Sequence, residues 1–340
     1  MAAAAAALLT ARKSATHRYH EACSNILHCR LAFHRIPRRS FSTEHGSFAH
    51  MLSKEQRLRT VPQAFWRSKA AHLEGAIPGT PLCRDPYAQT LSEQLLEAAE
   101  LQVLLDNATD TQKSEELAAQ EGVRGAFMDR FIIDSLGQRV RQVVLLGSGM
   151  DCRVFRLELP PQMRFIEVDE GEVHEAKCAA LTATSAHGRC LVKRQAVSLS
   201  DGLGMEDLIR TITVAFKPRQ PTLFLLDGAL SSWPAEAQLA AVEAAAALST
   251  QGSTVVGPAP GESEQQEVVT SALSQAGFEK VNVINHHQLS KIYRRPLPES
   301  MKMLVAIRGG NHGPPQGGRN NGCRSSSSSS SKSHARELTF

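Results

Sequence analysis

Short apolar runs alternate with longer mixed stretches along the second half of the chain. Most runs are bounded by glycine, proline or a polar residue, and such a run is typical of a buried strand with apolar side chains on both faces. The longer stretches carry apolar residues at helical spacing. This alternation predicts an α/β fold. The expected strands are 143–146, 164–168, 189–197, 221–226, 253–257, 281–284 and 301–307, and the expected intervening helices include 171–184, 234–248 and 262–276.

The residues ahead of this alternation have the pattern of helices joined by loops. Apolar residues recur at helical spacing from Leu91 to Leu105. A breaker, Ala-Ile-Pro-Gly-Thr-Pro at 76–81, interrupts the pattern. A further amphipathic helix is expected through Leu136. The sequence therefore predicts one domain over 44–308, with a helical region at 52–121 and a sheet-forming core at 122–308.

Two neighbouring strands end in residues suited to bind a nucleoside. The strand at 143–146 runs into Gly147 and Gly149, and the next strand ends in Asp169. Glycines at the carboxyl end of a strand allow a tight turn and a close approach of ligand to backbone, and the acid can accept hydrogen bonds from ribose hydroxyls. The dinucleotide fingerprint expects a third glycine where Cys152 stands. A nicotinamide-dependent oxidoreductase is therefore the less favoured interpretation.

Two longer motifs contain these residues. Residues 147–157, GSGMDCRVFRL, resemble the G-A-G-L-D-T-R-x-x-R-L motif of the leucine carboxyl methyltransferase-like family of S-adenosylmethionine-dependent methyltransferases. Residues 165–177 resemble that family's E-V-D-x-P-E-V-x-x-x-K motif. The resemblance implies a Rossmann-like, seven-stranded class I methyltransferase sheet, with its last strand inserted antiparallel and an amino-terminal helical cap. Asp151 and Arg153 are expected to brace the glycine turn rather than to contact substrate.

The resemblance also implies which residues bind the cofactor, S-adenosyl-L-methionine. Arg124 lies in a segment that resembles the family's A-R-T-x-x-x-D pattern and would bind the cofactor's carboxylate, a role to which a guanidinium is suited. Gly147 and Gly149 would let the cofactor approach the chain, and Asp169 would hold its ribose. Asp227, after the fourth strand, would line the pocket near the methionine portion.

Three residues depart from the family's pattern. Gly125 replaces the usual threonine, and Ser232 stands where a tyrosine is expected. Ser198 stands where the family has an aspartate beside the adenine. A serine can still hydrogen-bond the adenine amino group, so Ser198 is a candidate cofactor-binding residue and Asp201 is a weaker one. Capping of a helix is the alternative role for both side chains.

Positive charge is concentrated at the two ends of the chain. The sequence has 38 Lys and Arg residues against 34 Asp and Glu residues. Residues 1–43 contain seven basic residues and one acid, and residues 308–340 contain five and one. The remaining 26 basic and 32 acidic residues lie in 44–307. A body with this balance carries no electrostatic footprint for nucleic acid.

The two ends differ from the body in composition as well. Residues 1–43 are rich in alanine, arginine, histidine and serine, which is typical of an organelle transit peptide. The segment 38–43, Arg-Arg-Ser-Phe-Ser-Thr, resembles the end of a mitochondrial presequence. A chloroplast peptide, or a disordered extension of a cytoplasmic protein, is the alternative. Residues 309–340 are rich in Gly, Pro, Asn and Ser, which predicts a disordered tail.

Neither a membrane span nor a metal site is expected. No apolar run approaches the ~20 residues that cross a bilayer. The cysteines show no C-x-x-C spacing, so a zinc site and a disulfide framework are unsupported. His286 and His287 are adjacent, without a cluster of carboxylates, and are expected in a loop.

The resemblance and the residues together predict a methyltransferase that acts on a carboxylate of a protein or a small molecule. A carboxylate is ionised at neutral pH, whereas a hydroxyl acceptor usually needs a general base. The sequence offers no convincing base and identifies neither the acceptor nor a catalytic residue. A non-catalytic, methyltransferase-like interaction protein stays open because of Gly125, Ser198 and Ser232.

Overall fold

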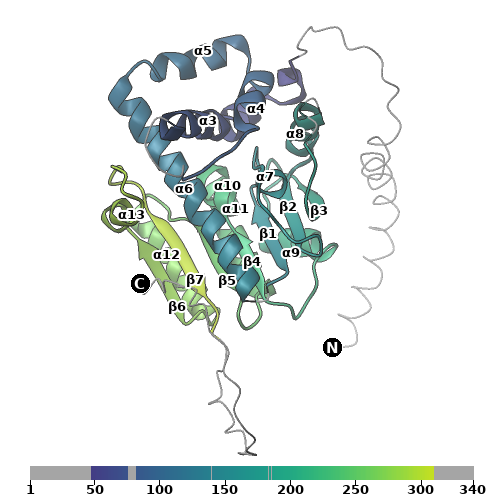
Figure 1. The fold of residues 1–340 in the computed structure, drawn as a ribbon. Helices are drawn as coiled ribbons and strands as arrows, with labels where there is room; N and C mark the ends of the chain where they lie inside the picture. The colour runs from purple at the N-terminus through teal and green to yellow at the C-terminus, as the bar shows by residue number, and fades with distance from the viewer. Residues whose placement is uncertain (1–46, 76–81, 139, 183, 185, 310–340) are drawn as a thin grey trace, which may run out of the picture. The chain divides into compact units, whose positions relative to one another are not determined.

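The protein is built on one seven-stranded sheet with the strand order β3-β2-β1-β4-β5-β7-β6 (Figure 1). A computed structural model describes residues 47–75, 82–138, 140–182, 184 and 186–309. The segment 76–81 and the ends at 1–46 and 310–340 lie outside the described residues, as do the expectations made for them. The strands are β1 (Gln142–Leu146), β2 (Arg164–Glu170), β3 (Leu191–Val197), β4 (Thr222–Leu225), β5 (Thr254–Pro258), β6 (Lys280–Ile284) and β7 (Met303–Ile307).

The strand pairing confirms the class I methyltransferase sheet. β1 runs parallel to β2 and β4, and β7 lies antiparallel between β5 and β6. All five residues of β1 are buried, because helices cover both faces of the sheet and apolar side chains are needed on each. Val143 and Leu145 pack into the core on one face, and Val144 and Leu146 pack into the core on the other.

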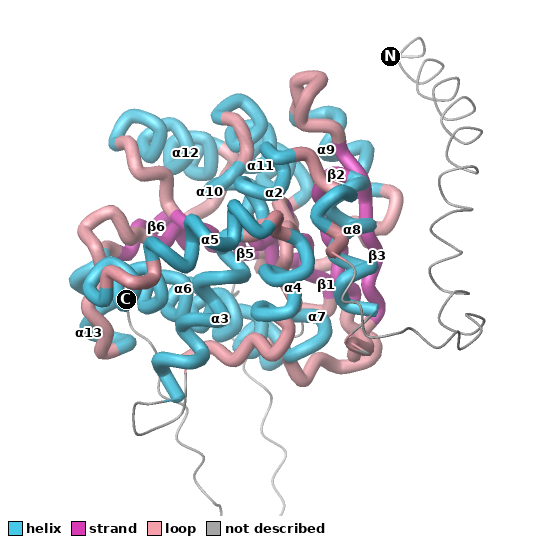
Figure 2. Tube along the Cα trace, turned by 90° about the horizontal axis from the view of Figure 1, so that it is seen from above, coloured by secondary structure: helices cyan, strands magenta, loops and turns pink. Residues whose placement is uncertain are grey.

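The two faces of the sheet carry different sets of helices (Figure 2). Leu208 of α9, Ala241 of α11 and Leu273 of α12 pack into one core. Phe127 of α6 and Leu289 of α13 pack into the other. The helices of the sheet-forming part are α6 (Thr111–Gly137), α7 (Arg153–Arg156), α8 (Gly171–Thr182), α9 (Met205–Thr213), α10 (Asp227–Ser232), α11 (Ala235–Leu248), α12 (Ser263–Gln275) and α13 (His286–Tyr293).

Short helices form the cap above the glycine turn. They are η1 (Ala49–Met51), α2 (Lys54–Thr60), α3 (Pro62–Gly75), α4 (Ala88–Leu95) and α5 (Ala98–Asn107). The expected helix from Leu91 to Leu105 is broken, because the backbone of Leu96 is extended (ψ 146°) and Glu97 caps a new helix there. The boundary expected between residues 121 and 122 falls inside α6, so one continuous helix joins cap and core.

The expectation that His286 and His287 lie in a loop is wrong. They are the first two residues of α13, because Asn285 caps this helix: its side chain accepts a hydrogen bond from Gln288 N at 3.1 Å. In return, Gln288 Oε1 accepts a hydrogen bond from Asn285 N at 3.1 Å, which completes a capping box. The described residues contain no group of three or more His, Cys, Asp or Glu side chains arranged to hold a metal. Within the same residues, no helix combines the length and apolar character needed to cross a membrane.

Candidate functional site

The glycine turn after β1 packs directly against the turn after β4. Gly147 has a φ of +71°, a conformation that favours glycine. A Cβ atom at Gly147 would lie 2.1 Å from Ala229 N, and one at Gly228 would lie 2.1 Å from Gly147 O. Both positions therefore require glycine, because each backbone occupies the space of the other's side chain. This contact brings the start of α10 to the carboxyl end of β1.

Asp169 lies beside the glycine turn, at the carboxyl end of β2. Its Oδ2 accepts a hydrogen bond from Gly149 N at 2.6 Å, and its Oδ1 accepts one from Glu170 N at 2.9 Å. The side chain is buried. Burial raises the pKa of this carboxyl, and the two backbone amides offset only part of the rise. The structure thus brings Asp169 together with Gly149, two of the residues expected to bind the cofactor.

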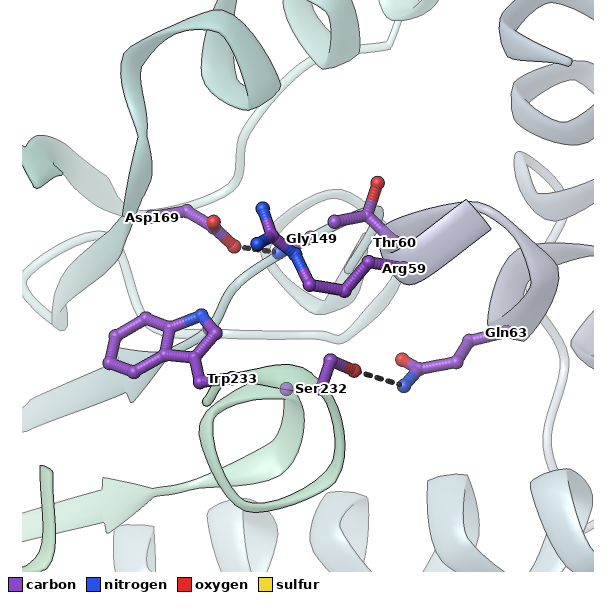
Figure 3. Close-up of a pocket in the computed structure, with 9 residues that line it drawn as sticks. Arg59, Thr60, Gln63, Gly149, Asp169, Ser232 and Trp233 are labelled. Atoms are coloured by element: carbon purple, nitrogen blue, oxygen red, sulfur yellow. Dashed lines mark hydrogen bonds between the residues drawn. The ribbon is translucent and has the colours of Figure 1, made fainter. Parts of the chain in front are cut away.

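A small cavity separates the glycine turn from the cap (Figure 3). The cap contributes the α2–α3 junction: Arg59 forms an ion pair with Glu170 beside the cavity, and Gln63 Nε2 donates hydrogen bonds to the hydroxyls of Ser231 at 3.2 Å and Ser232 at 3.3 Å. The cavity has a volume of about 10 Å³. Its lining consists of Arg59, Thr60, Gln63, Gly147, Gly149, Asp169, Gly228, Ser232 and Trp233.

The chemistry of this lining fits an adenosine-type cofactor, but the space is too small to admit one. Asp169 offers a carboxylate for a ribose diol, and the Trp233 indole offers an aromatic surface for a base. A cavity of about 10 Å³ has room for roughly one water molecule. In this structure α2 and the start of α3, together called the lid, close over the glycine turn, so the cofactor fits only after the lid or the lining side chains shift. Gly149 faces this lid, since a Cβ there would lie 3.8 Å from Thr60.

Arg124 and Asp227 pair with each other, and neither lines the cavity. Arg124 Nε donates to Asp227 Oδ1 at 2.5 Å, and its Nη2 donates to Ser231 Oγ at 3.0 Å. Both side chains are buried. Burial alone would raise the pKa of the Asp227 carboxyl, but the charges of Arg124 and Arg153 hold that pKa at about 2. Their roles as cofactor ligands stay predictions. In this closed arrangement neither side chain lines the cavity, so contact with the cofactor would need a rearranged, open cap.

Asp151 and Arg153 brace the glycine turn, as expected. Asp151 Oδ1 accepts a hydrogen bond from Arg153 N at 2.8 Å, and their side chains also form an ion pair. Arg153 Nε donates to Asp129 Oδ1 of α6 at 2.8 Å, and its Nη1 lies 3.2 Å from Asp227 Oδ2. Lys177 Nζ donates to Asp151 O at 3.3 Å. These contacts connect the glycine turn to three helices: α6 through Asp129, α8 through Lys177 and α10 through Asp227.

Ser198 is exposed and does not line the cavity. Its hydroxyl donates to Asp201 Oδ2 at 2.9 Å, and the Ser200 hydroxyl donates to Asp201 Oδ1 at 3.3 Å. The loop after β3 therefore carries a carboxylate next to Ser198, although the sequence position where the family has an aspartate holds a serine. Contact of Ser198 with adenine stays a prediction.

Sequence reasoning missed the cap residues of the cavity, and it also missed Trp233. Arg59, Thr60 and Gln63 lie in a region without a recognised motif. Ser53 and Gln56 form a capping box at the start of α2, and this signal could have located the helix. It could not have shown that the end of α2 packs on the glycine turn.

Comparison with known proteins identifies the family of the chain. The profile of the leucine carboxyl methyltransferase family matches residues 61–246. A protein of Mycobacterium avium (strain 104) that carries the name of an S-adenosyl-L-methionine-dependent methyltransferase is 31% identical over 225 residues, which cover 61% of this chain and 70% of that protein. A Frankia alni protein of the same name is 36% identical over 139 residues, 41% of this chain and 47% of that protein.

Among solved structures, a methyltransferase-like protein from Thermobifida fusca YX is 15% identical and has a TM-score of 0.43; the match covers 66% of this chain and 93% of that chain. The family match runs from the start of α3 in the cap through the glycine turn and β2 almost to the end of α11. The chain belongs to the leucine carboxyl methyltransferase family and is an S-adenosylmethionine-dependent methyltransferase.

Proposed function

We propose that the enzyme methylates a carboxylate, on a protein or a small molecule, and forms a methyl ester. The observation that carries this proposal is the composition of the cavity. Among the described residues that line it, Arg59 and Asp169 are the only ones with a titratable side chain. Both oxygens of Asp169 accept hydrogen bonds from backbone amides. The lining therefore supplies no free base, which a hydroxyl acceptor would usually need.

A carboxylate needs no base, because it is ionised at neutral pH. When bound, the cofactor supplies an activated methyl group on its sulfonium. One oxygen of the acceptor's carboxylate would form the new bond to the methyl carbon as the carbon–sulfur bond breaks, and no proton would be transferred. The protein's task is to hold the reacting atoms in line and to exclude water. Arg59 lies at the cavity in an ion pair with Glu170, and its guanidinium would favour an anionic acceptor once movement of the cap separates this pair.

The proposal is tested by the chemical stability of the transferred methyl group. The full-length enzyme is supplied with S-adenosylmethionine labelled on the methyl group and with peptides and small organic acids as acceptors. Each acceptor is paired with its carboxamide as a matched control. We expect the free acids to become labelled and the carboxamides to stay unlabelled. Alkali should release the label from the free acids as methanol. Label that resists alkali, or that appears on the carboxamides, would refute ester formation.

We also propose that residues 1–43 direct the protein into mitochondria. Seven basic residues against one acid support import driven by positive charge. Residues 1–43 fused to a fluorescent protein should enter mitochondria, and a fusion with Arg38 and Arg39 changed to Glu should enter less. Accumulation of the unaltered fusion in the cytoplasm or in a plastid would refute the proposal.

A further inference from the structure

A second hollow lies between α11 and α12, outside the cofactor cavity. It is an open groove of about 290 Å³. Four of its lining residues have apolar side chains, and Val268 is 46% exposed although it is a large apolar residue. An exposed apolar hollow rimmed by polar residues commonly marks a binding surface. The lining consists of Ala235, Leu239, Glu262, Glu264, Gln265, Val268 and Val269.

The chain that forms this groove is acidic throughout. From Gln220 to Glu279 the sequence contains seven Asp and Glu residues and neither Lys nor Arg. Glu262 and Glu264 are exposed in the groove itself, and neither forms an ion pair with a described residue. No basic side chain among the described residues contributes to the lining. The groove therefore presents negative charge beside apolar surface.

Helix stability accounts for part of this arrangement. Glu262 is the residue before α12 and Glu264 lies in its first turn, where the helix dipole favours negative charge. The dipole does not account for the exposure of Val268 one turn further along. Nor does it account for the lack of basic residues on α11, which forms the other wall. Apolar walls with an acidic rim are complementary to a chain segment that is apolar on one side and basic on the other.

We propose that the α11–α12 groove docks a basic polypeptide segment, with apolar side chains against Leu239, Val268 and Val269 and with Lys or Arg side chains beside Glu262 and Glu264. This docking surface is separate from the methyl-transfer site and does not depend on which acceptor is methylated.

The groove is connected to the cofactor cavity through the turn between α10 and α11. Gln265 Nε2 in the groove donates to Gln238 Oε1 at 2.9 Å, and Gln238 Nε2 donates to Trp233 O at 2.8 Å. Trp233 lines the cavity. A segment docked in the groove would therefore lie at one end of a short hydrogen-bonded chain whose other end, Trp233, forms part of the cavity wall.

The test uses the full-length protein with methyl groups of Leu and Val labelled for NMR. The probe is a short synthetic peptide of Leu and Lys at helical spacing, and a Leu and Glu peptide of equal length is its control. We expect the Lys peptide to shift the methyl signals of Leu239, Val268 and Val269, and the Glu peptide to leave them unchanged. Shifts confined to another surface would overturn the proposal.

Two double charge reversals of equal size distinguish docking in the groove from non-specific electrostatic attraction of the basic peptide to the protein. Glu262→Lys with Glu264→Lys changes the groove. Glu115→Lys with Glu116→Lys changes exposed carboxylates of α6, a helix on the opposite face of the sheet. We expect the groove variant to lose about tenfold in peptide affinity, the scale of two lost charge contacts, and the α6 variant about twofold at most. Equal losses in the two variants would overturn the proposal. So would dimerisation of the unliganded protein that Val268→Glu abolishes, because the groove would then hold a second copy.

Discussion

Arg124 and Asp227 form a buried ion pair that joins α6 to the start of α10, with Nε and Oδ1 2.5 Å apart. Removing one member of a buried pair leaves the other charge in the interior, which costs about 3–5 kcal/mol. Asp227 keeps Arg153 Nη1 at 3.2 Å as a second partner, so we expect Arg124→Ala to lower the free energy of unfolding in urea by about 3 kcal/mol, the low end of this range. Arg124→Met combined with Asp227→Leu should recover most of this loss. A single variant as stable as the wild type would show that the pair does not form in solution.

The lid contacts of Gln63 should control how fast the cofactor enters. Gln63→Ala removes the hydrogen bonds to Ser231 and Ser232 that hold the α2–α3 junction on the core. A loss of about 1 kcal/mol from the closed state corresponds to about a fivefold faster association, which stopped-flow binding of S-adenosylhomocysteine measures. Gln102→Ala, which removes an exposed hydrogen bond to Asp106 within α5, is the control. An unchanged association rate in Gln63→Ala would argue against a lid at this position.

Gly125 departs from the family's threonine because Cys83 occupies the space. A Cβ at residue 125 would lie 2.8 Å from Cys83 Sγ. Gly125→Thr should therefore lower the free energy of unfolding by about 1–3 kcal/mol through overpacking, as thermal or urea unfolding would show. Cys83→Gly in the same chain should restore part of the loss. Equal destabilisation with and without the Cys83 change would mean that a different contact requires the glycine.

His174 should make the protein less stable in mild acid. Burial lowers the pKa of this imidazole to about 3, and the charge of Lys177 adds to the effect. Between about pH 3 and 6.5 the unfolded chain binds a proton at His174 that the folded protein does not. Stability must therefore fall as the pH drops through this window, by about 2 kcal/mol between pH 7 and pH 5.

Urea unfolding of the wild type and of His174→Gln at these two pH values measures the effect. Glutamine carries no charge at either pH. The free energy of unfolding of His174→Gln should therefore change between the two pH values by about 2 kcal/mol less than that of the wild type. Equal pH dependence in the two proteins would show that His174 does not cause the loss.

The sheet was predictable from the sequence because its strands are buried on both faces. A continuous apolar run such as 143–146, bounded by glycine, is too short for a helix and fits a strand between two layers of helices. The antiparallel place of β7, by contrast, came only from the resemblance, since no local pattern fixes strand direction. The break at Leu96 was not predictable, because apolar residues keep helical spacing on both sides of it. In α5, Val103 is 59% exposed and Leu105 is 39% exposed, so periodicity there did not indicate a buried face.

The site was predictable to the extent that it lies at strand ends. Gly149 and Asp169 meet because the carboxyl ends of neighbouring parallel strands share one edge of the sheet. The lid residues Arg59 and Gln63 reach that edge through tertiary packing of the cap. No spacing in the sequence predicts this packing. The pairing of Arg124 with Asp227 brings together side chains 103 residues apart, and it depends on the same packing.

The most direct test of the cofactor site is calorimetric titration of S-adenosylmethionine into the full-length protein and its Asp169→Ala variant. The wild type should bind in the micromolar range. The variant should bind more weakly by about 1.5–3 kcal/mol, the scale of hydrogen bonds lost to a charged group, while Asp134→Ala, a change in an exposed carboxylate of α6, should bind as the wild type does. Undiminished affinity in a folded Asp169→Ala protein would contradict the account, because the cofactor would then lie elsewhere than at the glycine turn.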